Sequence, residues 1–174
     1  MKKLSILLLL SFILLTASTA SGQQKSDSSP TDKGWWIGGQ IGYWYDDGEN
    51  TFTLEPEIGY DFNSRWAAGT SFGVALVDDL TVYAIAPYAR WKYCSTNRLT
   101  LFLDGGLAVA GGDMTGFKIG LQPGLSIKIN NHFRLLTSVG FLGYCNEFYN
   151  GGSGDGFGVR FSSSDLKFGF HYTF

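Results

Sequence analysis

The sequence is poor in charged residues, proline and cysteine, and after its N-terminus it has no long apolar run. Charged residues make up 16% of the 174 positions, and there are four prolines and two cysteines. No stretch after the first 22 residues reaches the ~18 consecutive apolar residues of a transmembrane helix. If the protein lies in a membrane, it must therefore cross it with strands. Without Lys2 and Lys3 the chain keeps 11 basic and 15 acidic residues, and this acidic balance gives no support to nucleic-acid binding.

Aromatic residues and glycine are abundant instead. Aromatic residues make up 16% of the chain and there are 24 glycines, whereas the strong helix formers are scarce beyond residue 20. Many aromatic residues and glycines with few charges are typical of a β protein with one face in lipid.

The N-terminus has the pattern of a cleaved export signal. Lys2 and Lys3 precede the apolar run Leu4–Leu15, and small residues follow to Gly22. We expect residues 1–22 to be a signal peptide, cleaved after Ala20 or Gly22. The polar residues 23–33 predict a flexible lead-in, and residues 34–174 form the folded domain.

From Gly34 onward apolar residues recur at every second position, which predicts strands. Thr51–Phe62 shows this best, because Phe52, Leu54 and Ile58 alternate with Thr53, Glu55 and Glu57. Each predicted strand has the ~9–11 residues needed to cross a bilayer at a tilt. The eight predicted strands are Trp35–Tyr45, Thr51–Phe62, Trp66–Leu76, Val82–Tyr93, Leu99–Val109, Phe117–Ile129, Phe133–Tyr144 and Val159–Phe174.

The connections alternate between short turns and mostly longer, acidic loops, as in membrane barrels. Three prolines interrupt the predicted strands, at Pro56, Pro87 and Pro123. Because proline cannot donate to a sheet ladder, we expect a bulge at each of them.

The two faces of the strands predict an inside-out barrel. The apolar face is large, while the other carries many glycines and a few rings, namely Trp36, Trp44, Tyr88 and Phe102. Such a face suits the narrow interior of eight strands, which side chains can fill. Apolar-face aromatics also gather near both strand ends, as expected for rings at two membrane interfaces.

The C-terminal segment carries a family resemblance. Phe168, Phe170, Tyr172 and Phe174 alternate to the last residue and resemble the signal that the outer-membrane insertion machinery reads. With the export signal, eight strands and alternating turns, the chain resembles the small OmpA/OmpX-type barrels. The resemblance implies an all-β, eight-stranded antiparallel up-and-down transmembrane barrel in the outer membrane of a Gram-negative bacterium. It further implies lipid and lipopolysaccharide as neighbours, and we expect a monomer.

Charged residues on the glycine-rich face are nearly balanced in sign. We interpret them chiefly as an ion-pair network that fills the barrel, since a buried charge needs a partner; a selectivity constriction is the alternative. The predicted network consists of Glu55, Glu57, Asp61, Arg90, Lys92, Asp104, Lys118, Lys128, Arg134, Asp165 and Lys167.

Other candidate sites are weaker. Asp46, Asp47 and Glu49 in one acidic loop are possible cation ligands, but solvated loop charge explains them more simply. His132 and His171 lack an adjacent serine in a recognisable motif, so we assign no catalytic residue and no cofactor. Cys94 and Cys145 fall at opposite ends of the barrel, too far apart for a disulfide.

The sequence favours a non-enzymatic barrel that acts in envelope integrity or in surface interactions through its acidic outer loops. A narrow porin-like channel or hydrophobic-ligand conduit is one alternative. A barrel enzyme that modifies lipid A is the other.

Overall fold

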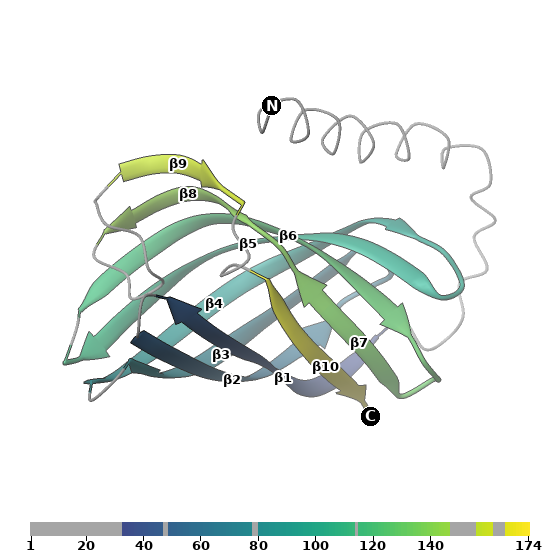
Figure 1. Cartoon of the computed structure of the whole chain (residues 1–174). Coiled ribbons are helices and arrows are strands. Elements are labelled where there is room, and N and C mark those ends of the chain that lie inside the picture. The colour runs from purple at the N-terminus through teal and green to yellow at the C-terminus, as the bar shows by residue number, and fades with distance from the viewer. Residues whose placement is uncertain (1–32, 47–48, 78–79, 114, 147–155, 162–165) are drawn as a thin grey trace, which may run out of the picture.

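The structure, a computed structural model, describes residues 33–46, 49–77, 80–113, 115–146, 156–161 and 166–174 (Figure 1). The residues predicted as signal peptide and most of the lead-in lie outside this part. The described segments form ten strands: β1 (Gly34–Asp46), β2 (Glu49–Asp61), β3 (Trp66–Val77), β4 (Leu80–Ser95), β5 (Leu99–Gly112), β6 (Gly116–Lys128), β7 (Phe133–Ser138), β8 (Phe141–Asn146), β9 (Gly156–Arg160) and β10 (Lys167–Thr173).

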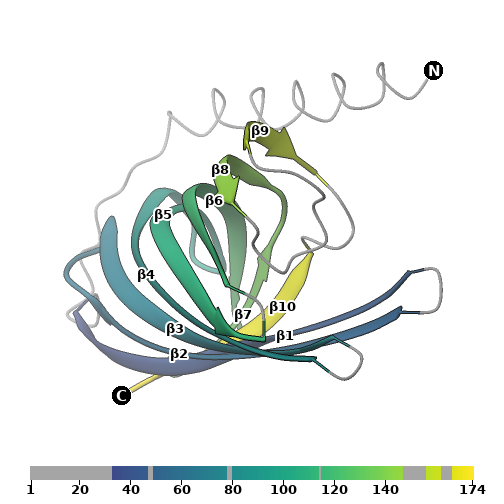
Figure 2. The same ribbon diagram turned by 90° about the vertical axis from the view of Figure 1, so that its left-hand side faces the viewer.

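All strand pairs are antiparallel, and the sheet closes on itself. Successive strands from β1 to β7 are hydrogen-bonded neighbours, β7 pairs with β10, and β10 returns to β1. In the closing pair Trp36 lies opposite Thr173 and Ile41 lies opposite Phe168. Figure 2 shows the strands curving around one interior. The predicted eight-stranded up-and-down barrel is confirmed, with two of its eight strands divided into shorter segments.

The predicted strand Phe133–Tyr144 is divided into β7 and β8 at Val139 and Gly140. Gly140 has a φ of 71°, a conformation that side-chain-bearing residues rarely adopt. β6 pairs with both parts, but its register shifts by one residue across the break, from Gly124 opposite Ser138 to Leu121 opposite Leu142. The predicted last strand is likewise divided, into β9, which pairs with β8, and β10.

The expectation of a bulge at every strand proline is wrong for two of the three. Pairing between β2 and β3 skips Pro56 and resumes in the same register, and pairing between β4 and β5 does the same around Pro87. These prolines thus remove ladder bonds without inserting a residue. Pro123 does lie at the register change of β6, where its carbonyl accepts a 3.0 Å hydrogen bond from the Val139 amide.

Two of the short turns at one end of the barrel are built on asparagine side chains. Asn63 Oδ1 accepts hydrogen bonds of 2.8 Å from the amides of Arg65 and Trp66. Asn130 Oδ1 does the same for His132 and Phe133, at 2.9 and 2.8 Å. In each turn the amide oxygen satisfies two backbone donors between consecutive strands. We call this end of the barrel the turn end.

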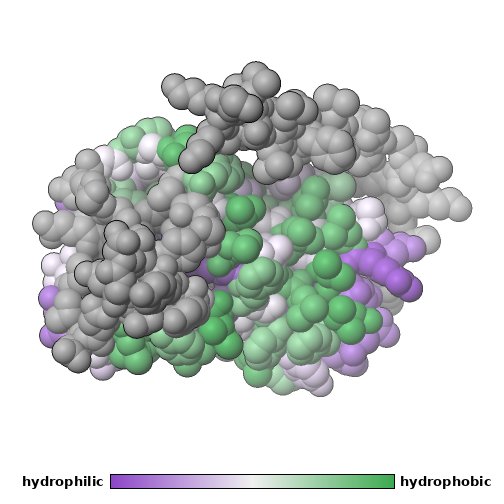
Figure 3. All heavy atoms as spheres, in the orientation of Figure 1, coloured by the Kyte–Doolittle hydropathy of each residue, from purple (hydrophilic) through white to green (hydrophobic). Residues whose placement is uncertain are grey.

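Most large apolar side chains lie on the outside of the barrel, and Figure 3 shows hydrophobic residues gathered on one of its faces. Leu54 and Ile58, for example, are 44% and 43% exposed. Near the turn end the outward rings form a belt, in which Trp35 contacts Tyr60 at 5.3 Å between centroids and Trp66 stacks on Trp91 at 6.4 Å. An apolar band ending in aromatic rings is the exterior of a membrane-spanning barrel.

Among the described residues, no helix is long and apolar enough to span a membrane.

Replacing Leu54 by lysine tests this exterior. Leu54 lies near the middle of β2, so we expect Leu54→Lys to destabilise the barrel in lipid vesicles by about 2–4 kcal/mol. Urea unfolding, followed by gel mobility without heating, measures the change. Asn97→Lys, in an exposed turn, is the control and should have little effect; equal stability of the two variants would show that this face is solvated.

Candidate functional site

Aromatic rings fill the barrel interior near the turn end. Trp36 and Phe102 are 2% and 1% exposed. The imidazole of His171 stacks on Trp36 with 3.8 Å between ring centroids and an interplanar angle of 12°. The Arg90 guanidinium lies over the Phe102 ring at 4.0 Å, a distance suited to a cation–π contact. These side chains come from β1, β4, β5 and β10 and meet across the interior.

Glycines on the facing strands make room for these rings. A Cβ on Gly59 would overlap the indole of Trp36, and a Cβ on Gly124 would overlap the ring of Phe102. At Gly69 an added Cβ would lie 2.9 Å from both Trp36 and Tyr88. The glycines of the inner face are therefore the counterparts of its few large side chains.

Strand β2 supplies three carboxylates that reach partners on other strands. The two carboxylate oxygens of Glu55 accept hydrogen bonds from Lys167 Nζ on β10, at 2.6 and 2.7 Å. Glu57 lies 2.6 Å from His171 Nε2 and accepts a 2.7 Å hydrogen bond from the Tyr88 hydroxyl. Each of these pairs spans the interior, because β2 is separated from β10 and β4 by one strand.

The third carboxylate of β2 and a separate pair complete the network. Asp61 accepts a 2.7 Å hydrogen bond from Lys92 on β4, and it lies 3.7 Å from Arg134 on β7. Arg90 donates two hydrogen bonds to Asp104 on the neighbouring β5, at 2.7 and 2.8 Å. A bidentate, charge-assisted pair of this kind fixes geometry as well as charge.

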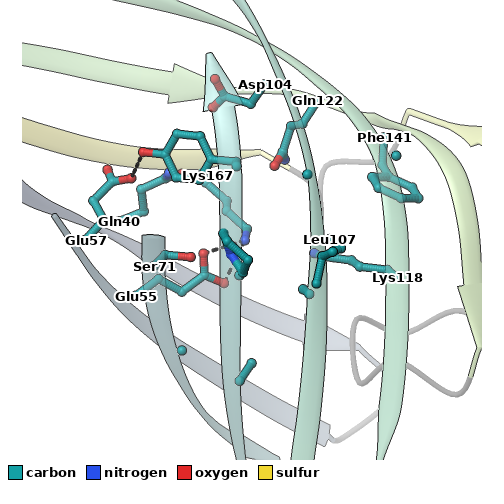
Figure 4. A pocket seen from close by; sticks show the side chains of 18 residues that line it. Gln40, Glu55, Glu57, Ser71, Asp104, Leu107, Lys118, Gln122, Phe141 and Lys167 are labelled. Carbon is teal, nitrogen blue, oxygen red and sulfur yellow. Dashed lines mark hydrogen bonds and ion pairs between the residues drawn. The ribbon is translucent and has the colours of Figure 1, made fainter. Parts of the chain in front are cut away.

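The other half of the interior contains a small cavity of about 80 Å³ (Figure 4). Polar side chains that include Gln40, Glu55, Gln122 and Lys167 line it together with Phe141. A buried water needs ~10–15 Å³, so this cavity has room for several. Small apolar residues also form a buried cluster that includes Ala75, Val82 and Ala108, and Ala108 lines the cavity.

Three residues of the predicted network remain, Lys118, Lys128 and Asp165. Lys118 lines the cavity. Lys128 is exposed, opposite Arg134 at the turn end. Asp165 lies outside the described residues, as does the loop residue Asp47.

The predicted loop cation ligands lie outside the described part of the structure, Asp47 as a whole and Asp46 and Glu49 in their side chains. Among described residues, no group of three or more His, Cys, Asp or Glu side chains could hold a metal ion. Cys94 and Cys145 are free thiols near opposite ends of the barrel.

The sequence did not identify the partner of His171 or the role of Tyr88. His171 is 4% exposed and held between Trp36 and Glu57. The inward glycines could have indicated where these side chains lie, because a large inward ring needs small residues on the facing strands. His132 is exposed, and its Nδ1 lies 2.9 Å from the Thr173 carbonyl oxygen.

Comparison with known proteins adds little to this description. No family model matches the chain, and no curated protein matches it. Among solved structures, the barrel is similar to OmpT, an outer membrane protein of Vibrio cholerae, at 14% identity and a TM-score of 0.29. The match covers 82% of this chain and 52% of the other, so the chain spans about half the length of that protein. The class of protein rests on the fold itself, a closed eight-stranded antiparallel β-barrel.

A methyl group added at Gly59 should disturb the ring packing. We expect Gly59→Ala to destabilise the barrel by about 1–3 kcal/mol, because Trp36 has no space to yield. Gly111→Ala is the matched control, since nothing lies within 4 Å of its added Cβ. Urea unfolding in vesicles measures both variants. If Gly59→Ala were as stable as Gly111→Ala, the interior would not be packed around Trp36.

The Arg90–Asp104 pair offers a second test of the interior. Arg90→Met leaves the Asp104 carboxylate buried without its main partner, and we expect a loss of about 3–5 kcal/mol. Arg90→Met combined with Asp104→Leu removes both charges and should recover most of that loss. A double variant as unstable as Arg90→Met would mean that the pair stabilises the fold beyond mutual neutralisation.

Proposed function

We propose that this protein is a non-enzymatic outer-membrane barrel of the small OmpA/OmpX type, whose interior is closed to ions. Its role is envelope integrity or surface interaction through its acidic outer loops. The observation that carries the proposal is the set of side chains that meet across the interior at the turn end. Trp36, Phe102 and His171 are each less than 5% exposed.

The geometry favours a closed interior over a pore. A conducting channel needs a continuous aqueous path. Here the space among Trp36, Asp61, Arg90, Phe102 and their neighbours amounts to about 10 Å³, room for no more than one water. The interior cavity of about 80 Å³ is therefore closed at this packed layer.

The same geometry disfavours an enzyme of the interior. His171 is the one buried histidine of the described residues, and its Nε2 is engaged by Glu57 while its ring is covered by Trp36. A general base must reach the proton that it abstracts. Because one ring face and Nε2 are both occupied, His171 acts as a packing residue. We therefore assign the function to the outer surface of the barrel.

The C-terminal residues fit the proposed insertion signal. Phe168, Phe170, Tyr172 and Phe174 all point outward and are 43–70% exposed. Outward rings on the closing strand are accessible before the barrel closes, so the insertion machinery can bind them during assembly.

Conductance across a planar bilayer tests the proposal. We expect the refolded protein to give no single-channel steps. Trp36→Ala combined with Phe102→Ala removes two rings of the packed layer and should introduce steps, because the cavity then continues to the turn end. Leu76→Ala, on the outward face where the side chain is 46% exposed, is the control and should stay silent. Regular steps from the unaltered protein would contradict the proposal.

A further inference from the structure

Three basic residues form a row across neighbouring strands at the turn end. Lys128 on β6 lies directly opposite Arg134 on β7. On its other side Lys128 donates its amide hydrogen to the carbonyl oxygen of Arg98, at 2.7 Å, at the end of the turn before β5. Cross-strand neighbours have Cβ atoms ~4.5–5.5 Å apart, so three positively charged side chains lie side by side. We call Arg98, Lys128 and Arg134 the basic row.

The basic row belongs to the inner face of the barrel, at its rim. Ser126 lies two residues before Lys128 on β6 and is 6% exposed. Leu136 lies two residues after Arg134 on β7 and is 4% exposed. Because every second residue of a strand shares a face, the basic row points toward the opening of the interior. Arg98 and Lys128 are exposed there, while Arg134 lines the small space of the packed layer.

Little negative charge offsets the basic row. Asp61 Oδ2 lies 3.7 Å from Arg134, but Oδ1 of the same carboxylate accepts a 2.7 Å hydrogen bond from Lys92. Within the described part of the chain, Arg98 and Lys128 form no ion pair, either with an acidic side chain or with the C-terminal carboxylate. Like charges directly opposite each other destabilise a sheet. An oxyanion that contacts all three side chains would remove this repulsion.

We propose that the basic row binds a phosphoryl group, either of a soluble phosphate ester or of a phospholipid headgroup. Two planar guanidinium groups and one ammonium group can donate to three oxygens at once. A phosphoryl group offers three such oxygens, whereas a carboxylate offers two. The site lies at the turn end and requires only the barrel fold, so it is independent of the role proposed for the outer loops.

Calorimetric titration of inorganic phosphate into the full refolded chain in a neutral detergent tests the site. At constant ionic strength we expect one phosphate to bind per barrel. A hydrogen bond to a charged group is worth roughly tenfold in affinity, so Lys128→Gln should weaken binding by about that factor. Lys33→Gln is the matched control and should leave the affinity nearly unchanged. Lys33 is also exposed at the turn end, but it lies two residues before the outward Trp35, outside the basic row.

Urea unfolding, followed by gel mobility without heating, gives a readout that a purely structural role of Lys128 would not move. Without phosphate, Lys128→Gln should be at least as stable as the unaltered protein, because it removes a like-charged neighbour. Saturating phosphate should raise the urea midpoint of the unaltered protein but not that of Lys128→Gln, since a ligand stabilises only a state that binds it.

The source of the phosphoryl group is distinguished in lipid nanodiscs of phosphatidylcholine or phosphatidylglycerol. Equal affinity for inorganic phosphate in both lipids would support a soluble phosphate ester. Loss of phosphate binding in phosphatidylglycerol alone would support the headgroup of an anionic lipid, which then occupies the basic row itself.

Three outcomes would overturn the site. The first is the absence of phosphate binding in detergent and in both kinds of nanodisc. The second is an equal loss of affinity in Lys33→Gln and Lys128→Gln, which would reduce the effect to general attraction by the net charge. The third is a roughly tenfold gain in affinity in Asp32→Asn, which would assign the basic row to an acidic residue of the chain's own N-terminal segment.

Discussion

The narrow interior of an eight-stranded barrel is the constraint on which the rest of this structure depends. Every second residue must share that interior, and eight strands leave only enough width for side chains to fill it. Three side chains with rings, Trp36, Phe102 and His171, meet there because Gly59 and Gly124 offer no side chains of their own. Most of the other large apolar side chains lie on the outside of the barrel.

The charged residues follow from the same constraint. Placing them outside would expose them to lipid, so they lie inside, where each needs a partner within hydrogen-bonding distance. Glu55, Glu57 and Asp61 all come from β2, and their basic partners come from β4, β7 and β10. Because these pairs join strands that are not neighbours, they form only when the barrel is closed in the correct register. The network thereby links the charge balance of the interior to the closure between β1 and β10.

Much of the fold follows from the sequence, because the period of two is a local property. The limits of β3 to within one residue, the start of β5 at Leu99 and the outward position of Leu54 and Ile58 needed no tertiary information. The break at Val139 and Gly140 could not be predicted, since the alternation runs through it and the positive φ of Gly140 depends on β6 opposite. The bulges predicted at Pro56 and Pro87 did not form, because these prolines lose their ladder bonds without a register shift.

The site was less predictable than the fold, for a reason that His171 illustrates. Alternation places it in the interior, but the partner of an inward side chain is set by strand tilt and closure, which bring Glu57 of β2 to β10 across β1. The same logic applies outside. Ala68, Ala89 and Gly105 are unremarkable in the sequence and become neighbours on the outer face only through the register of three strands. In a barrel, a strand pattern therefore fixes which way a side chain points, while the closed sheet decides what it meets.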